Sequence, residues 1–221
     1  MYAAIKAASV VRNIEVERSR LLSRTNSLGN TGPDDKGVTV AVACAISKSP
    51  KQAALLSSIA GMFAPRYAIE LGTNVGISSA YIAPVIDGTL VTLEVSHARL
   101  ALAREIHGNL GISNVKYVVG LFENTLSGVL ENMPAVNFAF IDGHHQYQPT
   151  IDYFGRIVSH AEPGAVFVFD DIRLTDGMKK AWSELRADER FGLVVDFWTF
   201  GVCVLRADNE PRVVTEPITC Y

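Results

Sequence analysis

The sequence predicts an α/β fold built on a mostly parallel sheet that closes with an antiparallel hairpin. From residue 67 onward, short apolar runs alternate with segments of helical periodicity. This alternation is typical of right-handed strand–helix–strand units, whose strands are parallel. Near the C-terminus, two strand-like runs are separated by only Thr199. One residue leaves no room for a crossover helix, so these last two strands are expected to pair antiparallel.

The elements follow each other at regular spacing. Strands are expected at residues 67–71, 89–95, 115–119, 136–142, 164–170, 191–198 and 200–206, which makes a seven-stranded sheet. Helices are expected at about 76–86, 97–109, 123–131, 147–160 and 175–187. Helices on both faces of such a sheet give a doubly wound, Rossmann-like arrangement.

Residues 1–48 are expected to form an N-terminal extension of helices and loop, and residues 49–221 the ligand-binding domain. Residues 1 to about 24 have helical spacing, and this amphipathic helix either caps the sheet or packs on a second subunit of a homodimer. Residues 25–37 are dense in Gly, Asn and Asp and predict a loop, which is either a lid or simply mobile. Residues 38–46 fit a strand or a buried helical turn equally well. Ser49 and Pro50 then start a helix that runs to about residue 63.

The composition favours a small-molecule partner. With 20 basic and 23 acidic residues and a formal net charge of −3, the chain has no basic excess for nucleic acid or a membrane surface. Its apolar runs are shorter than the ~20 residues of a membrane-spanning helix, and its N-terminus lacks a signal-peptide core. A cytoplasmic location is therefore expected. The three cysteines have no metal-ligand spacing.

The stretch 67–83 (YAIELGTNVGISSAYIA) contains a strand, a glycine-bearing turn and a helix in that order. This order brings backbone N–H groups to the edge of a sheet, where a nucleotide-like ligand can bind. The turn from Gly72 to Gly76 lacks the middle glycine of the G-x-G-x-x-G motif that suits a pyrophosphate. Glu70 would also repel a diphosphate, whereas it suits a ligand that carries an ammonium and a sulfonium. The turn therefore favours S-adenosylmethionine over NAD.

Other expected strands also end in or beside acids, and the carboxyl ends of parallel strands meet at one edge. Glu94 follows Gly72 by 22 residues, the place of a carboxylate that accepts the hydroxyls of a ribose. Asp142, Asp170 and Asp171 end two further strands, and three converging carboxylates favour Mg²⁺ or another divalent cation. The neighbouring residues His144 and His145 could coordinate, act as a base, or cap the next helix.

The order of these motifs resembles that of the S-adenosylmethionine-dependent O-methyltransferases of the catechol and caffeoyl-CoA type, and of related small-molecule O-methyltransferases with a DG-H-Y motif. The matching segments are ELGTNVGIS, TLEVS, VVGLFENTL, FIDGHHQY and FVFDDI. The resemblance covers roughly residues 65–206 and leaves the first ~48 residues outside.

The resemblance implies a cofactor site made by Glu70, Gly72, Thr73, Asn74, Gly76, Ser78, Glu94, Val95, Gly120, Leu121, Phe122 and Asp142. It implies metal ligands at Asp142, Asp170 and Asp171, and catalytic roles for Asp142 with His145 or His144. This chain departs from the catechol type at two of these positions. Asp171 stands where that type has Asn, and His145 stands where it has a lysine base.

The activity that follows is methyl transfer from S-adenosylmethionine to a hydroxyl of a small molecule, assisted by a divalent metal. The metal would lower the pKa of the acceptor hydroxyl and a histidine would take its proton. Two other classes remain open at this point: a non-catalytic binding module with this fold, and an NAD-dependent oxidoreductase. The acidic trio has no use in the oxidoreductase, and a decayed site would not be expected to keep both acidic sets.

Overall fold

The structure, a computed structural model, describes residues 2–207 and 211–218, and the side chains from residue 9 onward. It confirms the Rossmann-like α/β class, with a mostly parallel sheet, antiparallel C-terminal strands and flanking helices. The sheet has eight strands, so the prediction of seven was wrong. The additional strand is β8 (Val213–Val214), whose two residues are too few to carry a periodic signal in the sequence.

The chain divides into two compact units, and each is described by itself. The first unit contains Met1–Arg66 and Thr73–Leu121. The second contains Tyr67–Gly72 and Phe122–Tyr221. This division does not test the predicted boundary at residue 48, which stays a prediction.

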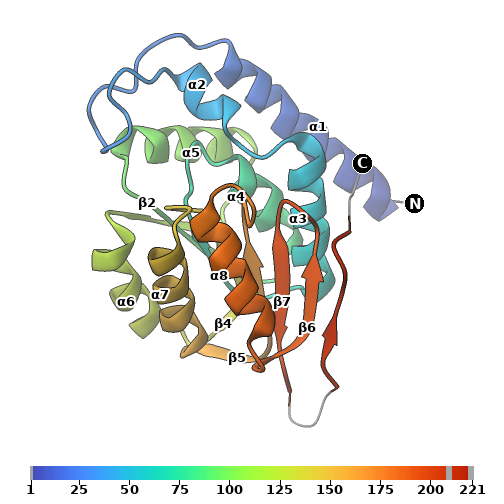
Figure 1. Ribbon diagram of the computed structural model, residues 1–221. Helices are drawn as coiled ribbons and strands as arrows, with labels where there is room; N and C mark the ends of the chain where they lie inside the picture. The colour runs from blue at the N-terminus through green and yellow to red at the C-terminus, as the bar shows by residue number, and fades with distance from the viewer. Residues whose placement is uncertain (1, 208–210, 219–221) are drawn as a thin grey trace. The chain divides into compact units, whose positions relative to one another are not determined.

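The first unit carries the N-terminal helices and two parallel strands (Figure 1). Its helices are α1 (Tyr2–Leu22), α2 (Val40–Ala45), α3 (Pro50–Phe63), α4 (Ile77–Ile82) with a 3₁₀ turn at Ala83–Val85, and α5 (His97–Asn109). Its strands β2 (Thr89–Glu94) and β3 (Val115–Val119) pair in parallel from Leu90↔Val115 to Glu94↔Val119.

Local sequence explains where these helices begin. Residues 40–45 form a helix because the Thr39 hydroxyl accepts a hydrogen bond from the N–H of Val42, which settles the ambiguity at 38–46. α3 starts with a capping box between Ser49 and Gln52, as expected from Ser49-Pro50. Apolar residues from α1, the 25–39 loop, α2, α4 and α5 form one buried cluster, which includes Ile14, Leu28, Val40, Tyr81 and Ile106. The N-terminal segment therefore shares a core with the helices of the predicted ligand-binding domain.

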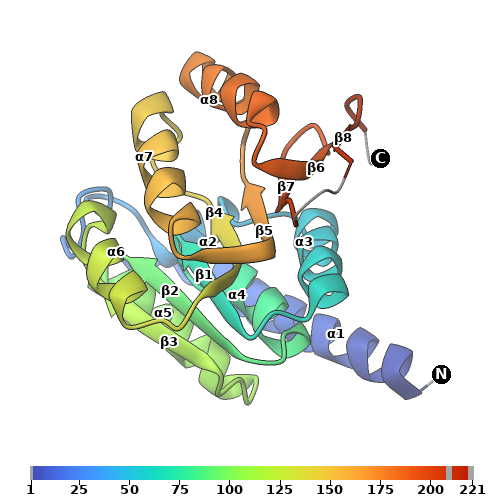
Figure 2. The ribbon, with the colours of Figure 1, turned by 90° about the horizontal axis from the view of Figure 1, so that it is seen from below.

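The second unit contains the remaining strands in the order β1-β4-β5-β7-β6-β8. They are β1 (Tyr67–Leu71), β4 (Val136–Ile141), β5 (Ala161–Phe169), β6 (Phe191–Asp196) and β7 (Gly201–Leu205), together with β8. β1, β4 and β5 are parallel, β7 is antiparallel to both β5 and β6, and β8 is parallel to β6 (Figure 2). The predicted C-terminal hairpin is thus confirmed.

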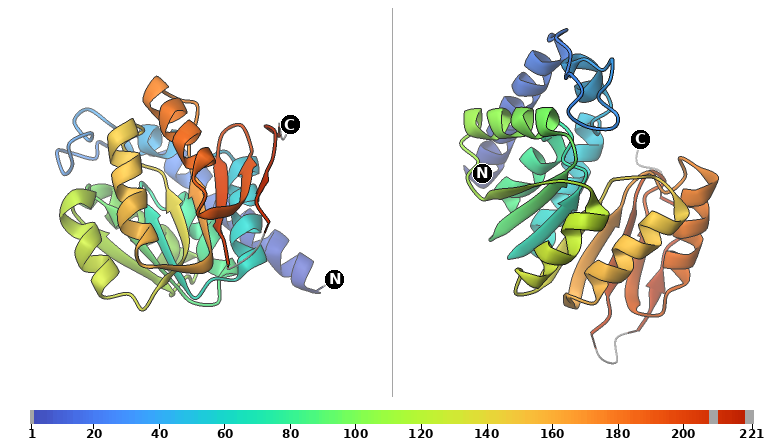
Figure 3. Two further views of the ribbon diagram at one scale, coloured as in Figure 1. Left: turned by 60° about the horizontal axis from the view of Figure 1, so that its bottom comes forward. Right: turned by 90° about the vertical axis from the view of Figure 1, so that its left-hand side faces the viewer.

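Three helices of this unit lie along the same face of its strands (Figure 3). They are α6 (Phe122–Glu131), α7 (Tyr147–Val158) and α8 (Asp176–Ala187). Phe154 of α7 packs in an aromatic cluster with Phe167, Phe169 and Phe191 of the strands, and the contacting rings have centroids 5.3–6.3 Å apart. No helix in the described part of the chain is both long and apolar enough to cross a membrane.

Candidate active site

Gly72 is required where β1 ends, because its backbone lies against Asp142 of the neighbouring segment. Its φ is +100°, and a Cβ there would lie 2.0 Å from the carbonyl oxygen of Asp142. The two segments approach because β1 and β4 pair in parallel, and the N–H of Asp142 donates to the carbonyl of Leu71 at 2.9 Å. Glu70, the second-last residue of β1, is fully buried. The sequence placed this acid and this glycine correctly at the carboxyl end of a strand.

The turn continues in the first unit from Thr73 to Gly76. The Thr73 hydroxyl bonds that of Thr92 on β2 at 2.5 Å, so its side chain fixes the turn to the strand. Gly76 has φ +86° and precedes α4, and a Cβ there would lie 2.7 Å from that of Ala103. Only glycine combines that backbone conformation with this close approach. Ser78, in the first turn of α4, is 7% exposed.

Glu94 ends β2, and its carboxylate is held by two backbone donors. The N–H of Asn74 donates to Oε2 at 2.8 Å, and the N–H of Ser96 donates to Oε1 at 3.0 Å. An ionised carboxylate can accept about four hydrogen bonds. Two therefore remain for ligand hydroxyls, which fits the role predicted for this acid.

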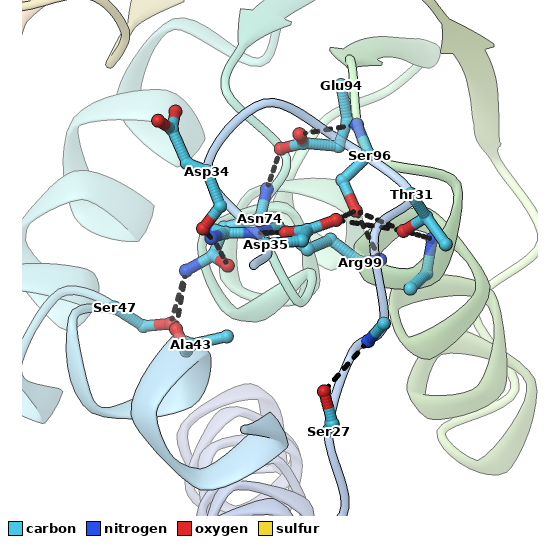
Figure 4. Close-up of polar contacts among 12 residues, drawn as sticks. Ser27, Thr31, Asp34, Asp35, Ala43, Ser47, Asn74, Glu94, Ser96 and Arg99 are labelled. Carbon is cyan, nitrogen blue, oxygen red and sulfur yellow. Dashed lines mark hydrogen bonds and ion pairs between the residues drawn. The ribbon is translucent and has the colours of Figure 1, made fainter. Parts of the chain in front are cut away.

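The side chain of Asn74 is bonded at both of its polar ends (Figure 4). Its Nδ2 donates to the carbonyl of Ala43 at 2.8 Å and to the Ser47 hydroxyl at 3.4 Å, while its Oδ1 accepts from Arg99 at 3.2 Å. Asn74 has φ +48°, a left-handed conformation that asparagine tolerates better than most residues. This side chain links the turn to α2 and α5 and has little left to offer a ligand.

The segment predicted to border an adenine begins beside Glu94. The N–H of Gly120 donates to the backbone carbonyl of Glu94 at 3.0 Å, and its φ of +138° favours glycine. Leu121 is 38% exposed, and Val95 is half-buried. Phe122 belongs to the second unit, where its ring packs edge-on against Tyr153 with centroids 5.5 Å apart.

In the second unit, Asp142, His145 and Asp171 come together where β4 and β5 end. One ligand atom of each residue lies within 4.8 Å of the others. The Nε2 of His145 lies 3.6 Å from Oδ1 of Asp142 and 3.9 Å from Oδ2 of Asp171. His145 and Asp171 have φ of +43° and +49°. Such conformations in non-glycine residues cost about 1–3 kcal/mol and cluster at functional sites.

Two other predicted residues lie differently. Asp170 is not a member of this three-residue group, and it is 1% exposed. His144 has φ +63° and packs against Phe122 and Tyr153, with ring centroids 5.9 and 5.7 Å away. Of the two histidines, His145 faces the carboxylates.

A charged cluster that the sequence reasoning did not identify lies in the loop after β5 and the tip of the hairpin. The two terminal nitrogens of the Arg173 guanidinium, Nη1 and Nη2, donate to Asp196 at 2.8 and 2.7 Å. The indole N–H of Trp182 and the backbone N–H of Trp198 donate to the same carboxylate at 2.8 and 2.9 Å. Burial alone would raise the pKa of Asp196, but these hydrogen bonds outweigh it and lower the pKa. The sequence did offer one signal for Asp196: it is an acid at the end of a strand, the same pattern that identified the other acids.

Arg173 also lies over the Trp198 ring, 4.6 Å from its centroid, and Trp198 is 51% exposed. The loop that carries Arg173 follows Asp171 directly and is tied to the hairpin by the bond from the N–H of Ile172 to the carbonyl of Thr199, at 3.1 Å. The arginine–carboxylate pair therefore fixes the loop next to the Asp171 carboxylate.

Comparison with known proteins shows which proteins this chain is similar to. A family model described as "Methyltransferase domain" matches residues 69–172. A catechol O-methyltransferase of Niastella koreensis is 29% identical over 165 residues, which is 73% of this chain and 69% of that protein.

Two solved structures share the fold. The O-methyltransferase TomG from Streptomyces achromogenes, in complex with SAM, has a TM-score of 0.62 and 24% identity over 73% of this chain and 82% of that chain. The O-methyltransferase from Bacillus cereus, in complex with SAH, has a TM-score of 0.65 and 19% identity over 90% of this chain and 91% of that chain. At these identities the likeness shows the fold alone. The chain thus resembles the S-adenosylmethionine-dependent O-methyltransferases, as its motifs predicted: residues 69–172 match a methyltransferase domain, and most of the chain aligns with a catechol O-methyltransferase.

Proposed function

We propose that this protein transfers the methyl group of S-adenosylmethionine to a hydroxyl oxygen of a small molecule, and that a divalent cation assists at Asp142 and Asp171. The observation that carries the proposal is the meeting of Asp142, His145 and Asp171 at the carboxyl ends of β4 and β5. The catechol O-methyltransferase relative supports an acceptor hydroxyl next to a second oxygen.

The cofactor part of the proposal rests on acids and glycines. Glu94 has hydrogen-bonding capacity left for the ribose hydroxyls, and Gly120 and Leu121 follow beside it for the adenine. Glu70 would provide a carboxylate for the cationic methionine end, and Gly72 lets the following turn pass close to Asp142. We propose that Asn74 supports the turn rather than touching the cofactor, because its side chain is already bonded to Ala43 and Arg99.

The metal part rests on the chemistry of the donor set. Carboxylates are the preferred ligands of Mg²⁺. Asp142 and Asp171 would hold the cation, acceptor oxygens would complete the site, and Nε2 of His145 would stay uncoordinated and act as the base. A cation bound there would lower the pKa of the acceptor hydroxyl. Asp170, buried beside Asp171, is proposed as a third ligand or as support for that loop.

The chemical step needs one base and an in-line approach. Nε2 of His145 would accept the acceptor's hydroxyl proton. The oxygen then forms a bond to the methyl carbon as the bond from that carbon to the sulfonium sulfur breaks. The electron pair of the broken bond stays on sulfur, which leaves neutral S-adenosylhomocysteine. Catalysis by positioning of this kind contributes most when the reacting atoms are held about 3–3.5 Å apart.

The test measures methyl transfer from labelled S-adenosylmethionine to catechol and a panel of phenols, with Mg²⁺ or with EDTA. Asp142→Asn and EDTA are each expected to lower turnover about 100-fold, or about 2.7 kcal/mol in the barrier. Asp152→Asn, an exposed change on α7, is the matched control and is expected to keep full turnover. Unchanged turnover in Asp142→Asn and in EDTA would show that the metal role is wrong.

The homodimer stays a prediction, and sedimentation analysis would test it.

A further inference from the structure

The loop at residues 25–39 is anchored on the first unit rather than extended into solvent. Leu28 is 6% exposed and belongs to the buried apolar cluster, and Ser27 bridges to Thr39. Further along the loop, Asp35 is only 1% exposed. A buried carboxylate in a loop rich in glycine and polar residues needs strong partners, since burying an unpaired charge is costly.

Two partners of Asp35, Ser96 and Arg99, are at the start of α5, and the third, Thr31, is in the same loop (Figure 4). Its carboxylate accepts from the Ser96 hydroxyl at 2.5 Å, from Nε of Arg99 at 2.9 Å and from the Thr31 hydroxyl at 2.8 Å. Ser96 in turn caps α5 by accepting from the N–H of Arg99 at 3.1 Å. The loop backbone also fits closely here, because a Cβ on Gly32 would lie 2.9 Å from that of Ser96.

Two paths lead from Asp35 to Glu94. In the first, Asp35 holds Ser96, whose backbone N–H donates to Oε1 of Glu94. In the second, Asp35 holds Arg99, whose Nη1 donates to Oδ1 of Asn74, and the backbone N–H of Asn74 donates to Oε2 of Glu94. Both oxygens of Glu94 are therefore oriented by residues that the Asp35 carboxylate fixes.

We propose that Asp35 and Arg99 are positioning residues that set the Glu94 carboxylate for the cofactor ribose, so that the N-terminal loop governs cofactor affinity. This inference rests on the proposed function, which assigns the ribose to Glu94. Neither residue touches the cofactor in this account, and both act through Ser96 and Asn74. The loop is thereby part of the cofactor site although it lies outside the matched methyltransferase domain.

The test is a double-mutant cycle on S-adenosylmethionine affinity, measured by calorimetry with the full chain. Asp35→Ala is expected to raise the Kd about tenfold in the wild-type background. In a Glu94→Gln background, the same change is expected to raise it less than twofold, because the group that Asp35 positions is already lost. Arg99→Gln, which leaves the Ser96 path in place, is expected to raise the Kd about threefold.

Glu105→Gln is the matched control, because it removes a charge of the same helix that pairs with Arg20 of α1 and with Arg24, two residues after α1 ends. It is expected to leave the Kd unchanged. If Asp35→Ala raises the Kd by the same factor in both backgrounds, Asp35 has only a general structural role, and the inference is overturned. If Asp35→Ala does not fold, the same comparison is made with Arg99→Gln. If wild type has no affinity for S-adenosylmethionine, the proposed function itself is overturned. If wild type binds it and Asp35→Ala binds it equally well, only this inference is overturned.

Discussion

At the scale of single residues, His107 shows how a buried side chain supports the turn from Gly72 to Gly76. Its Nε2 lies 2.9 Å from the carbonyl of Gly76 and its Nδ1 lies 2.7 Å from the Tyr117 hydroxyl. A carbonyl only accepts, so Nε2 carries the proton, and neutral Nδ1 accepts from Tyr117. The imidazole is thus neutral and fully bonded, and burial lowers its pKa.

This lowered pKa predicts a pH dependence of stability. Below about pH 6.5, His107 takes up a proton in the unfolded state but not in the folded state. The free energy of unfolding therefore keeps its full value above that pH and decreases as the pH falls. The slope approaches about 1.4 kcal/mol per pH unit for one proton. Urea unfolding between pH 7.5 and 5.5 measures it. His107→Gln is expected to flatten the decline, whereas the exposed control His160→Gln is expected to keep it. An equal decline in His107→Gln and wild type would contradict this assignment.

At the scale of elements, turns and strand ends decide what the sequence could predict. The acids and glycines were readable because parallel strands bring their carboxyl ends to one edge, and because glycine marks positive φ. The orientations of His144 and His145 were not readable, because they depend on two successive left-handed residues. The bond between Asp35 and Arg99 joins residues 64 positions apart and leaves no periodic trace.

The hairpin and the loop after β5 depend on Asp196, which is fully buried and accepts four hydrogen bonds. Asp196→Ala removes the partner of Arg173 and leaves the Trp182 N–H without an acceptor. Because Arg173 is partly exposed, we expect a loss of about 2–3 kcal/mol in the free energy of unfolding. Chemical denaturation measures this loss. Lys179→Ala, which breaks an exposed pair with Asp176, is expected to cost less than about 0.5 kcal/mol. Similar losses in the two variants would show that the buried pair does not stabilise the hairpin.

At the scale of the whole molecule, the proposed function gives two sets of acids different roles. Glu70 and Glu94 would bind a cationic methyl donor with a ribose, and Asp142 and Asp171 would bind a divalent cation. The fold class and the resemblance to O-methyltransferases followed from the order of these motifs. The eighth strand and the supporting network of the N-terminal loop needed the structure, since short strands and long-range side-chain bonds have no local pattern.

In the proposed function, the protein binds S-adenosylmethionine through Glu94. Calorimetric titration of wild type and Glu94→Gln with S-adenosylmethionine, and of wild type with NAD⁺, tests it most directly. We expect wild type to bind S-adenosylmethionine, Glu94→Gln to bind it at least about tenfold more weakly, and NAD⁺ not to bind to wild type. Equal affinity of both variants for S-adenosylmethionine, or binding of NAD⁺ in its place, would contradict it.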